Sequence, residues 1–132
     1  MANKTFYDVQ AANPEVKIIC GTFKPNAGSA IDNTANVGAG WTVARTGTGQ
    51  YTVTLDDSYP GLLSAQVTAQ INAAAATFLQ ITGAPDVSSA KTIIFTALTT
   101  SSTAAPVATD IPANANNHVH FVLFLRNTSL TQ

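Results

Sequence analysis

The sequence predicts an all-β protein, a single domain over residues 1–132 built as an antiparallel β-sandwich or jelly roll. Short runs rich in β-branched and aromatic residues recur along the chain, and several alternate between apolar and polar positions, as half-buried strands do. Clusters of Gly, Pro, Asn and Asp separate these runs and indicate turns. About seven short strands between such turns are typical of a sandwich.

The first part of the chain is predicted to contain an arm, a strand and a long loop. Residues 1–15 are polar and mixed, and we expect an extended N-terminal arm that ends at the turn signal Asn13-Pro14. Residues 16–24, VKIICGTFK, are rich in β-branched and aromatic residues and are predicted to form a strand. Residues 25–40 form a long connection, and loops of this length are often functional or lie against a partner.

A β-hairpin is predicted from residues 41–45 and 50–55. Both segments alternate between apolar and polar residues, so Trp41 and Tyr51 are expected on buried faces rather than on a sugar-stacking platform. The connection between them, TGTG, contains two glycines, which supply the positive φ that a tight hairpin requires. Arg45 is the hairpin's candidate for an outward contact.

The middle of the chain is predicted to contain three more strands. A turn, DDSYPG, precedes them. The expected strands are residues 62–71, 76–82 and 91–99. Residues 83–90 are predicted to form a loop, and residues 100–117 a second long loop with two prolines and no periodic pattern.

The last predicted strand, residues 118–127, is apolar on both faces. A strand of this kind is covered on both sides. In an antiparallel sheet, the second cover is either an opposing sheet or another subunit. Where another subunit is the cover, the interface lies on the side of the strand opposite Phe121 and Leu123, and its predicted residues are Val122, Phe124 and Arg126.

Arg126 follows the most apolar segment of the chain, where an unpaired charge would be costly to bury. One interpretation is an ion pair with Asp56 or Asp57, or a hydrogen bond to carbonyl groups, across a subunit interface. The other is an exposed strand end, which is the usual place for an arginine. Asp56 and Asp57 are adjacent, so on a strand they would point to opposite faces, and we expect turn-forming residues rather than an acid–base pair.

The remaining reactive side chains do not form a recognisable catalytic motif, and we expect neither catalytic residues nor a cofactor. His118 and His120 share a face of their strand, and as metal ligands they would need other chains to complete the site. We favour two polar residues at the start of a strand, without a metal. Cys20 is the single cysteine and is predicted to be a small buried hydrophobe.

The composition restricts the function further. The chain is 45% hydrophobic and 10% charged, with a net charge of −1. So little charge favours a protein whose surface is covered in an assembly. Six scattered Lys and Arg residues argue against nucleic-acid binding. The sequence shows neither an apolar signal region at its start nor a stretch long enough for a membrane span, so we expect neither a secretory signal nor a membrane partner.

Two segments, RTGTGQYTVTLDDSYPGLLSAQVT and HVHFVLFLRNTS, resemble small β-rich structural proteins of tailed bacteriophages. The resemblance covers residues 41–70 and 118–129. Proteins of this kind include capsid decoration (cement) proteins and the heads of fibre or tail proteins, without catalytic residues in this region. The resemblance implies a homotrimer, made in the host cytoplasm, that binds the major capsid protein at the capsid surface of the virion. Alternatives are the receptor-binding head of a tail fibre and a small β-sandwich lectin.

In a decoration trimer, the closing strand would line the trimer core, and the two long loops and the N-terminal arm would reach the capsid. The candidate capsid-contact residues in those loops are Asn26, Asp32, Asn36, Asp110 and Asn114.

Overall fold

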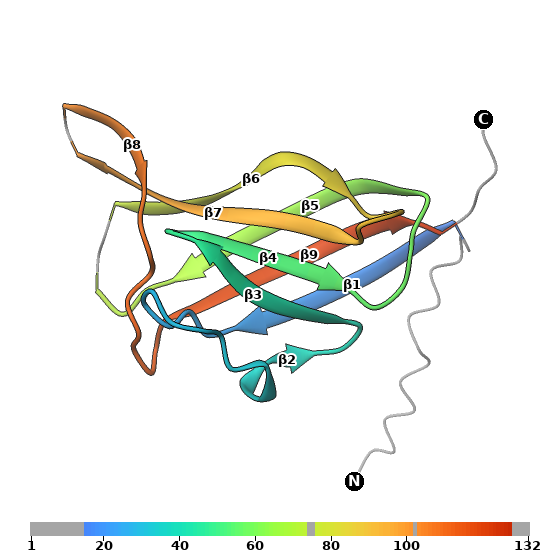
Figure 1. The fold of residues 1–132 in the computed structure, drawn as a ribbon, viewed down its shortest axis with the longest axis horizontal. Coiled ribbons are helices and arrows are strands. Elements are labelled where there is room, and N and C mark those ends of the chain that lie inside the picture. Colours follow the sequence, from blue (N-terminus) through green and yellow to red (C-terminus); the bar gives the residue numbers. More distant parts are fainter. Residues whose placement is uncertain (1–14, 74–75, 102, 128–132) are drawn as a thin grey trace, which may run out of the picture.

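Two antiparallel sheets pack face to face in the computed structural model, which describes residues 15–73, 76–101 and 103–127 (Figure 1). The arm predicted for residues 1–15 therefore lies, apart from Glu15, outside the described residues. In chain order the elements are β1 (Val16–Phe23), the 3₁₀ helix η1 (Asn33–Ala35), β2 (Val37–Gly38), β3 (Trp41–Gly47), β4 (Gln50–Leu55), β5 (Gly61–Gln70), β6 (Thr77–Asp86), β7 (Thr92–Ser101), β8 (Ala104–Ala108) and β9 (His118–Arg126).

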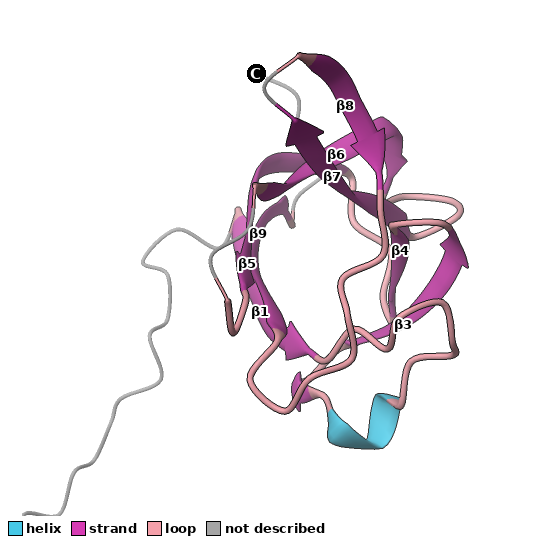
Figure 2. Cartoon of the chain, turned by 90° about the vertical axis from the view of Figure 1, so that its left-hand side faces the viewer, coloured by secondary structure: helices cyan, strands magenta, loops and turns pink. Residues whose placement is uncertain are grey.

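Sheet A contains four strands in the order β2-β1-β9-β5, and sheet B contains five, with β3-β4-β7-β6 in sequence and β8 paired to β7. Every strand pair is antiparallel. Figure 2 shows the two layers from one end, with the β7–β8 hairpin extending beyond them. The predicted all-β sandwich is thus confirmed.

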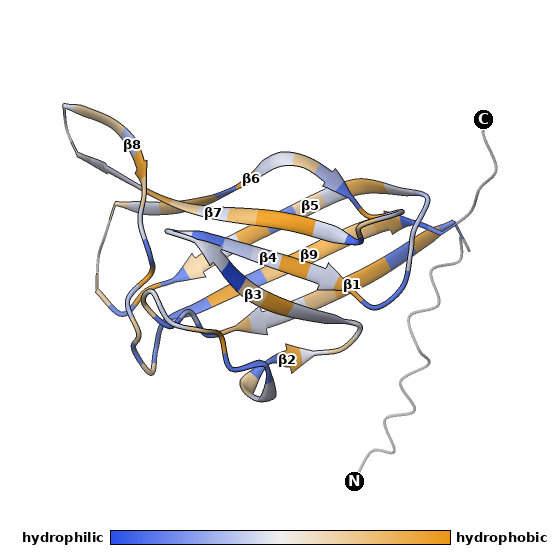
Figure 3. Ribbon diagram, viewed as in Figure 1, coloured by the Kyte–Doolittle hydropathy of each residue, from blue (hydrophilic) through white to orange (hydrophobic). Residues whose placement is uncertain are grey.

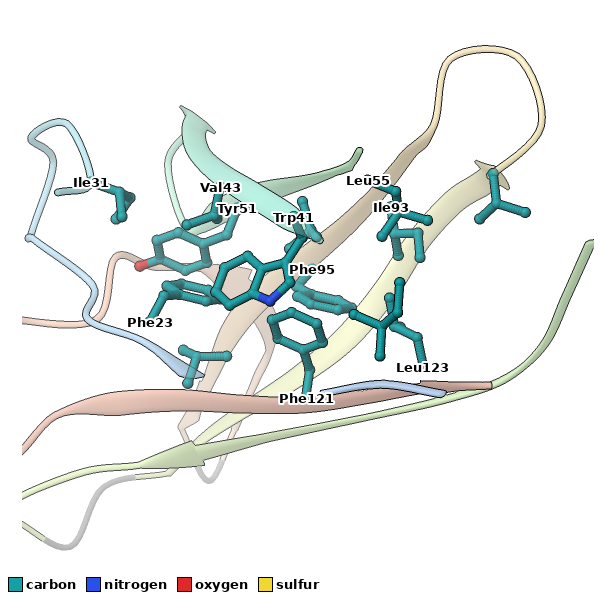
Figure 4. Packing of buried hydrophobic residues seen from close by; sticks show 14 of the residues in the cluster. Phe23, Ile31, Trp41, Val43, Tyr51, Leu55, Ile93, Phe95, Phe121 and Leu123 are labelled. Atoms are coloured by element: carbon teal, nitrogen blue, oxygen red, sulfur yellow. The ribbon is translucent and has the colours of Figure 1, made fainter. Parts of the chain in front are cut away.

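The core lies between the sheets and is built from every second residue of the inner strands. In β9, Phe121 and Leu123 point inward and are at most 2% exposed. The ring of Phe121 meets Trp41 edge to face at 4.8 Å between centroids and lies 5.5 Å from Phe95 (Figure 4). Tyr51 is 1% exposed in the same cluster. The prediction that Trp41 and Tyr51 are core residues is confirmed.

The predicted hairpin is also confirmed, as β3 and β4. Gly49 has φ of 66°, so the left-handed backbone expected at the turn is present there. Gly47 is not left-handed; it pairs with Gln50 after a register shift in β3. Such a bulge strengthens the local twist and fits a short connection between twisted strands.

Three sequence predictions differ from the structure. Residues 100–117 include the strand β8, which pairs with the end of β7. Strand β6 continues through Gly83 to Asp86, inside the predicted loop 83–90. The first long loop, residues 25–40, contains η1 and β2. Register shifts interrupt both β6 and β8, so neither shows regular alternation in its sequence.

Candidate interaction surface

The outer face of sheet A carries a row of apolar side chains that no second layer covers in the described chain. Phe124 and Val122 of β9 point to this face and are half-buried. Their partners on β1 are Ile18, opposite Phe124, and Cys20, opposite Val122. We call these four residues the apolar stripe; hydropathy along β1 and β9 can be followed in Figure 3.

Cys20 is exposed in this stripe, and the prediction of a buried cysteine is wrong. The register of β1 explains the difference. Ile19 and Phe23 point into the core, so Cys20 belongs to the opposite face of the strand. In the sequence KIICGTF, odd- and even-numbered positions both carry apolar residues, so the pattern does not indicate which face of the strand is buried.

Arg126 lies at one end of the stripe, between Val16 and Gly61 on the neighbouring strands. It makes no ion pair with Asp56 or Asp57 within the described residues. Beside the stripe, β5 presents uncharged polar side chains to the same face, each exposed. These residues are Ser64, Gln66, Thr68 and Gln70. The outer face therefore combines an apolar centre with a neutral polar flank and one arginine at its end.

His118 and His120 lie at the other end of β9 with their rings stacked, 6.0 Å apart. Both ring nitrogens of His120 are engaged, Nδ1 with the Thr22 hydroxyl at 2.8 Å and Nε2 with Gln70 Oε1 at 3.0 Å. Within the described ranges, no group of three or more His, Cys, Asp or Glu residues could hold a metal ion. The geometry fits the polar strand start that the sequence favoured.

The loop after β1 is organised by its own polar side chains. Asp32 caps η1, because its Oδ1 accepts from the Thr34 N–H at 2.9 Å and from the Thr34 hydroxyl. These bonds to Thr34 lower the pKa of Asp32. Asn26 donates to the Ala30 carbonyl at 3.2 Å, and Asn36 donates to Asn33 Oδ1 at 2.7 Å.

Asn33 anchors this loop to sheet B. Its amide donates to the Val43 carbonyl and accepts from the Val43 N–H, both at 2.9 Å. This two-way bond imitates a strand partner for β3. Sequence reasoning missed Asn33, since an asparagine in an Asn-containing loop carries no signal of its distant partner.

The structure brings three of the predicted capsid-contact residues together. Asn26 and Asp32 from the first long loop and Asn114 from the second line one depression of about 480 Å³, beside Lys24. Asn36 does not line this depression, and Asp110 is occupied elsewhere. The two long loops thus form a shared surface at one end of the sandwich.

Asp110 turns toward the β3–β4 hairpin. It accepts two hydrogen bonds from the Arg45 guanidinium and one from the Gly49 N–H, at 2.8 to 2.9 Å. The bond from Arg45 is the main cause of a lowered pKa at Asp110, and it raises the pKa of Arg45. Arg45, expected to make an outward contact, is used in an internal ion pair.

A second depression, of about 340 Å³, lies at the base of the β7–β8 hairpin and is lined by amides. Asn72, Asn114 and Asn117 contribute side chains to its wall, together with Ile71 and Pro112. Asn117 is 3% exposed and is held by the Asn72 N–H and the Pro112 carbonyl. The sequence did not indicate this cluster, because its members come from two distant segments.

No family model matches the chain, and neither a curated protein nor a solved structure matches it. Among the described residues, no helix has the length and apolar character needed to cross a membrane.

Proposed function

We propose that this protein is a structural virion protein, a homotrimeric capsid decoration (cement) protein that binds and stabilises the mature head of a tailed bacteriophage. The apolar stripe on the outer face of sheet A is the observation that carries the proposal. Ile18 is 44% exposed there, beside the exposed Cys20 and the half-buried Phe124. Contiguous exposed apolar surface commonly marks a protein interface.

Burial of the stripe supplies a driving force for self-association. Covering a large apolar side chain contributes at most about 1.5–3 kcal/mol, and less for side chains that are already half-buried. Few charges need to lose water, because Arg126 is the one formally charged side chain at the outward positions of β1, β5 and β9. A trimer packed through this face would use Val122, Phe124 and Arg126 as interface residues.

In this proposal, the depression formed by the two long loops faces the major capsid protein. Asn26, Asp32 and Asn114 lie around it. It lies at the end of the sandwich where β1 ends and β9 begins, away from the Arg126 end of the stripe. One surface is thereby left for the capsid while the other is buried between subunits.

A second candidate function is glycan binding, as in a fibre head or a small lectin. The amide-lined depression with Asn72, Asn114 and Asn117 favours it, since amides hydrogen-bond sugar hydroxyls and Pro112 provides an apolar wall. Retention on immobilised glycans, lost in Asn114→Ala, would support this second function over capsid decoration.

The first test is the absolute mass in solution, measured by light scattering. A trimer has three times the 13.7 kDa of one chain. Ile18→Asp is expected to reduce the mass to that of one chain, because it places a charge in the stripe. Phe78→Asp is the matched control: Phe78 is 41% exposed, near the 44% of Ile18, but lies on sheet B.

Co-sedimentation with expanded phage capsids then tests the partner. Wild-type protein is expected to bind, and the change Asn26→Ala with Asn114→Ala is expected to weaken binding without changing the trimer mass. A monomer at all concentrations would contradict the proposed assembly. A trimer that binds no capsid would contradict the decoration function.

A further inference from the structure

The sandwich is less well covered along its β5–β6 side than along the opposite side. In the described chain, the half-buried apolar side chains that pack against the core all come from β5, from Ile71 directly after it, or from β6. On the opposite side, the loop of residues 25–40 adds Ile31 to the core at 9% exposure. Strands β5 and β6 contact each other and run along one long side of the molecule (Figure 1). This side therefore retains apolar surface that a partner can cover.

Both strands belong to a stretch of the chain without charge. Residues 58–85 contain no Asp, Glu, Lys, Arg or His, although the chain as a whole is 10% charged. Strand β5 is the last strand of sheet A, and no described strand is hydrogen-bonded to its outer edge. At such an edge, every second residue directs its N–H and C=O groups away from the sheet, where another strand can pair with them.

The other sheet edges carry features that hinder pairing. Strand β2 has two residues, and the part of β1 that it leaves uncovered contains the exposed Lys17. On β3, the Asn33 side chain occupies the N–H and C=O groups of Val43. Strand β6 has a register shift and contains Pro85, and β8 contains Pro106. Strand β5 has neither a charge nor a proline.

The regular part of the β5 edge extends from Ser64 to Gln70. These residues pair one to one with β9, because the register shift of β5 lies before them. Their outward side chains are exposed Ser, Gln and Thr residues. Their inward side chains are small, apolar and half-buried: Ala65, Val67 and Ala69. The edge therefore offers an alternating and uncharged strand for pairing.

We propose that β5 is a self-association site, at which it pairs with β5 of a second copy of this chain. The two strands are antiparallel and related by a two-fold axis at Val67. In this register all residues of the regular stretch find a partner. It places Val67 opposite Val67 of the second copy, Ala65 opposite Ala69, Gln66 opposite Thr68, and Ser64 opposite Gln70.

A second copy fits this edge because the edge is complementary to itself. In a two-fold contact the same surface serves both partners, so free N–H groups meet free C=O groups in both directions. No charge has to lose its water, because neither strand carries one. Inward apolar residues meet inward apolar residues, and outward hydroxyl and amide groups meet one another, as in ordinary cross-strand pairs.

Neighbouring registers are less favourable. An axis at Gln66 would pair Leu62 with Gln70 and draw the irregular start of β5 into the contact. An axis at Thr68 would leave Ser64 and Ala65 without partners, because β5 ends at Gln70. A shift by a single residue would place inward side chains opposite outward ones. The axis at Val67 uses the whole regular edge and avoids the bulge.

This inference goes beyond the proposed function and does not rest on it. The apolar stripe lies on β1 and β9, so a trimer built on the stripe does not use the β5 edge. The same pairing would then join one trimer to the next. A contact between two strands is weak by itself, so we expect it to appear as the concentration rises, or where copies are held side by side.

Disulfide trapping tests the contact in the full-length protein. Cys20→Ser first removes the native thiol. Val67→Cys in this background places one thiol at the two-fold axis, where the Cα atoms of the two copies are close enough for a disulfide. Two thiols lose two protons and two electrons as the S–S bond forms, and oxidised glutathione accepts them and leaves as two reduced molecules. A non-reducing gel measures the rate of two-chain product.

Ala65→Cys is the matched control, since it lies on the same face of the same strand and is also half-buried. Its counterpart in the second copy would lie about 13 Å further along the strand, beyond the reach of a disulfide. A mixture of Ala65→Cys with Ala69→Cys restores the bond, because these positions face each other in the proposed register. Both measurements are repeated with Ile18→Asp added, which removes the stripe as an interface.

We expect Val67→Cys to form the two-chain product about ten-fold faster than Ala65→Cys alone, with and without Ile18→Asp. The mixture should form its bond faster than either of its components. A rate for Ala65→Cys alone that equals the rate for Val67→Cys would overturn the register. Rates equal to those of the chains unfolded in guanidinium would overturn the pairing of β5.

The outcome is separable from that of the proposed function. A ratio that disappears when Ile18→Asp is added would overturn β5 as a contact independent of the stripe. A wild-type protein that is monomeric by light scattering would contradict the proposed trimer, while a ten-fold ratio in the same protein would still support the β5 contact.

Discussion

Arg45 and Asp110 are joined by two hydrogen bonds although 65 positions separate them in the sequence. Arg45 Nε donates to Oδ1 at 2.9 Å, and Nη2 donates to Oδ2 at 2.8 Å. The Gly49 N–H shares Oδ1. This carboxylate therefore connects the β3–β4 hairpin to the chain that follows β8, and it holds the second long loop against the sandwich.

Replacing Asp110 is expected to make the free energy of unfolding less dependent on pH in the acidic range. Hydrogen bonds from Arg45 hold the pKa of Asp110 below its ordinary value of 3.8, so the unfolded chain takes up a proton before the folded protein does. The contribution of this group is complete above about pH 4 and is lost as the pH falls through the lower folded pKa. Asp110→Asn should lose about 1 kcal/mol at pH 7 and lose less than that below pH 3.

Urea unfolding of both proteins at several pH values measures this difference. Asp57→Asn serves as the control, because Asp57 makes no ion pair within the described residues. A wild-type advantage that persisted unchanged at pH 2 would contradict the assignment to the Asp110 carboxylate.

Gly49→Val is expected to impair folding more than Gly83→Val. Both glycines have left-handed backbones, with φ of 66° and 71°, so both variants store similar strain of about 1–3 kcal/mol. A Cβ at Gly49 would also lie 2.7 Å from the Ala97 carbonyl oxygen, whereas nothing lies within 4 Å at Gly83. We expect Gly49→Val to lose at least about 2 kcal/mol more of the free energy of unfolding than Gly83→Val, as measured with urea. Equal losses would show that the turn shifts to accept the Cβ atom at little cost.

Tyr51→Phe is expected to cost about 1–3 kcal/mol of unfolding free energy, since the Tyr51 hydroxyl accepts from the buried Ile111 N–H at 3.0 Å. Removing the oxygen leaves that N–H without a partner. Tyr59→Phe is a matched change at a buried tyrosine whose hydroxyl makes no hydrogen bond in the described part of the chain. It should change stability by less than about 0.5 kcal/mol. Thermal unfolding of both variants measures the two losses, and equal losses would contradict the role of the Tyr51 hydroxyl.

Gly21→Ala tests the packing of the indole. A Cβ at Gly21 would lie 2.3 Å from the Trp41 ring and 2.6 Å from the Phe121 ring, so the core must shift to accept it. At Gly61, another strand glycine, the nearest atom would be 4.0 Å away. Gly21→Ala is expected to lose about 1–3 kcal/mol and Gly61→Ala almost nothing, as measured by chemical denaturation. Equal stability of the two variants would contradict the close contact.

The strands that sequence reasoning located correctly are those in which one set of alternating residues is clearly apolar. Strand β9 and the β3–β4 hairpin are examples, because their inward residues include Phe121, Trp41 and Tyr51. Strand β8 was missed because AAPVA has no alternation and contains Pro106. Its position depends on pairing with β7, which the local sequence does not encode.

The candidate site was less accessible to prediction than the fold. The outward direction of Val122 and Phe124 followed from the alternation in β9. The participation of Ile18 and Cys20 depended on the β1–β9 register, which is a relationship between opposite ends of the sequence. The Arg45–Asp110 pair and the contact of Asn33 with Val43 also join residues that are distant in the sequence, so composition and spacing do not predict them.

Strands β1 and β9 lie side by side in opposite directions, and the Asn127 N–H donates to the Glu15 carbonyl at 2.6 Å. The two ends of the described fold therefore meet at one corner. A short peptide linking them would span little distance, so a circularly permuted chain opened at the exposed residues 56–58, between β4 and β5, is geometrically feasible. For the same reason, a cargo domain fused to either end would be presented from the same corner of the sandwich.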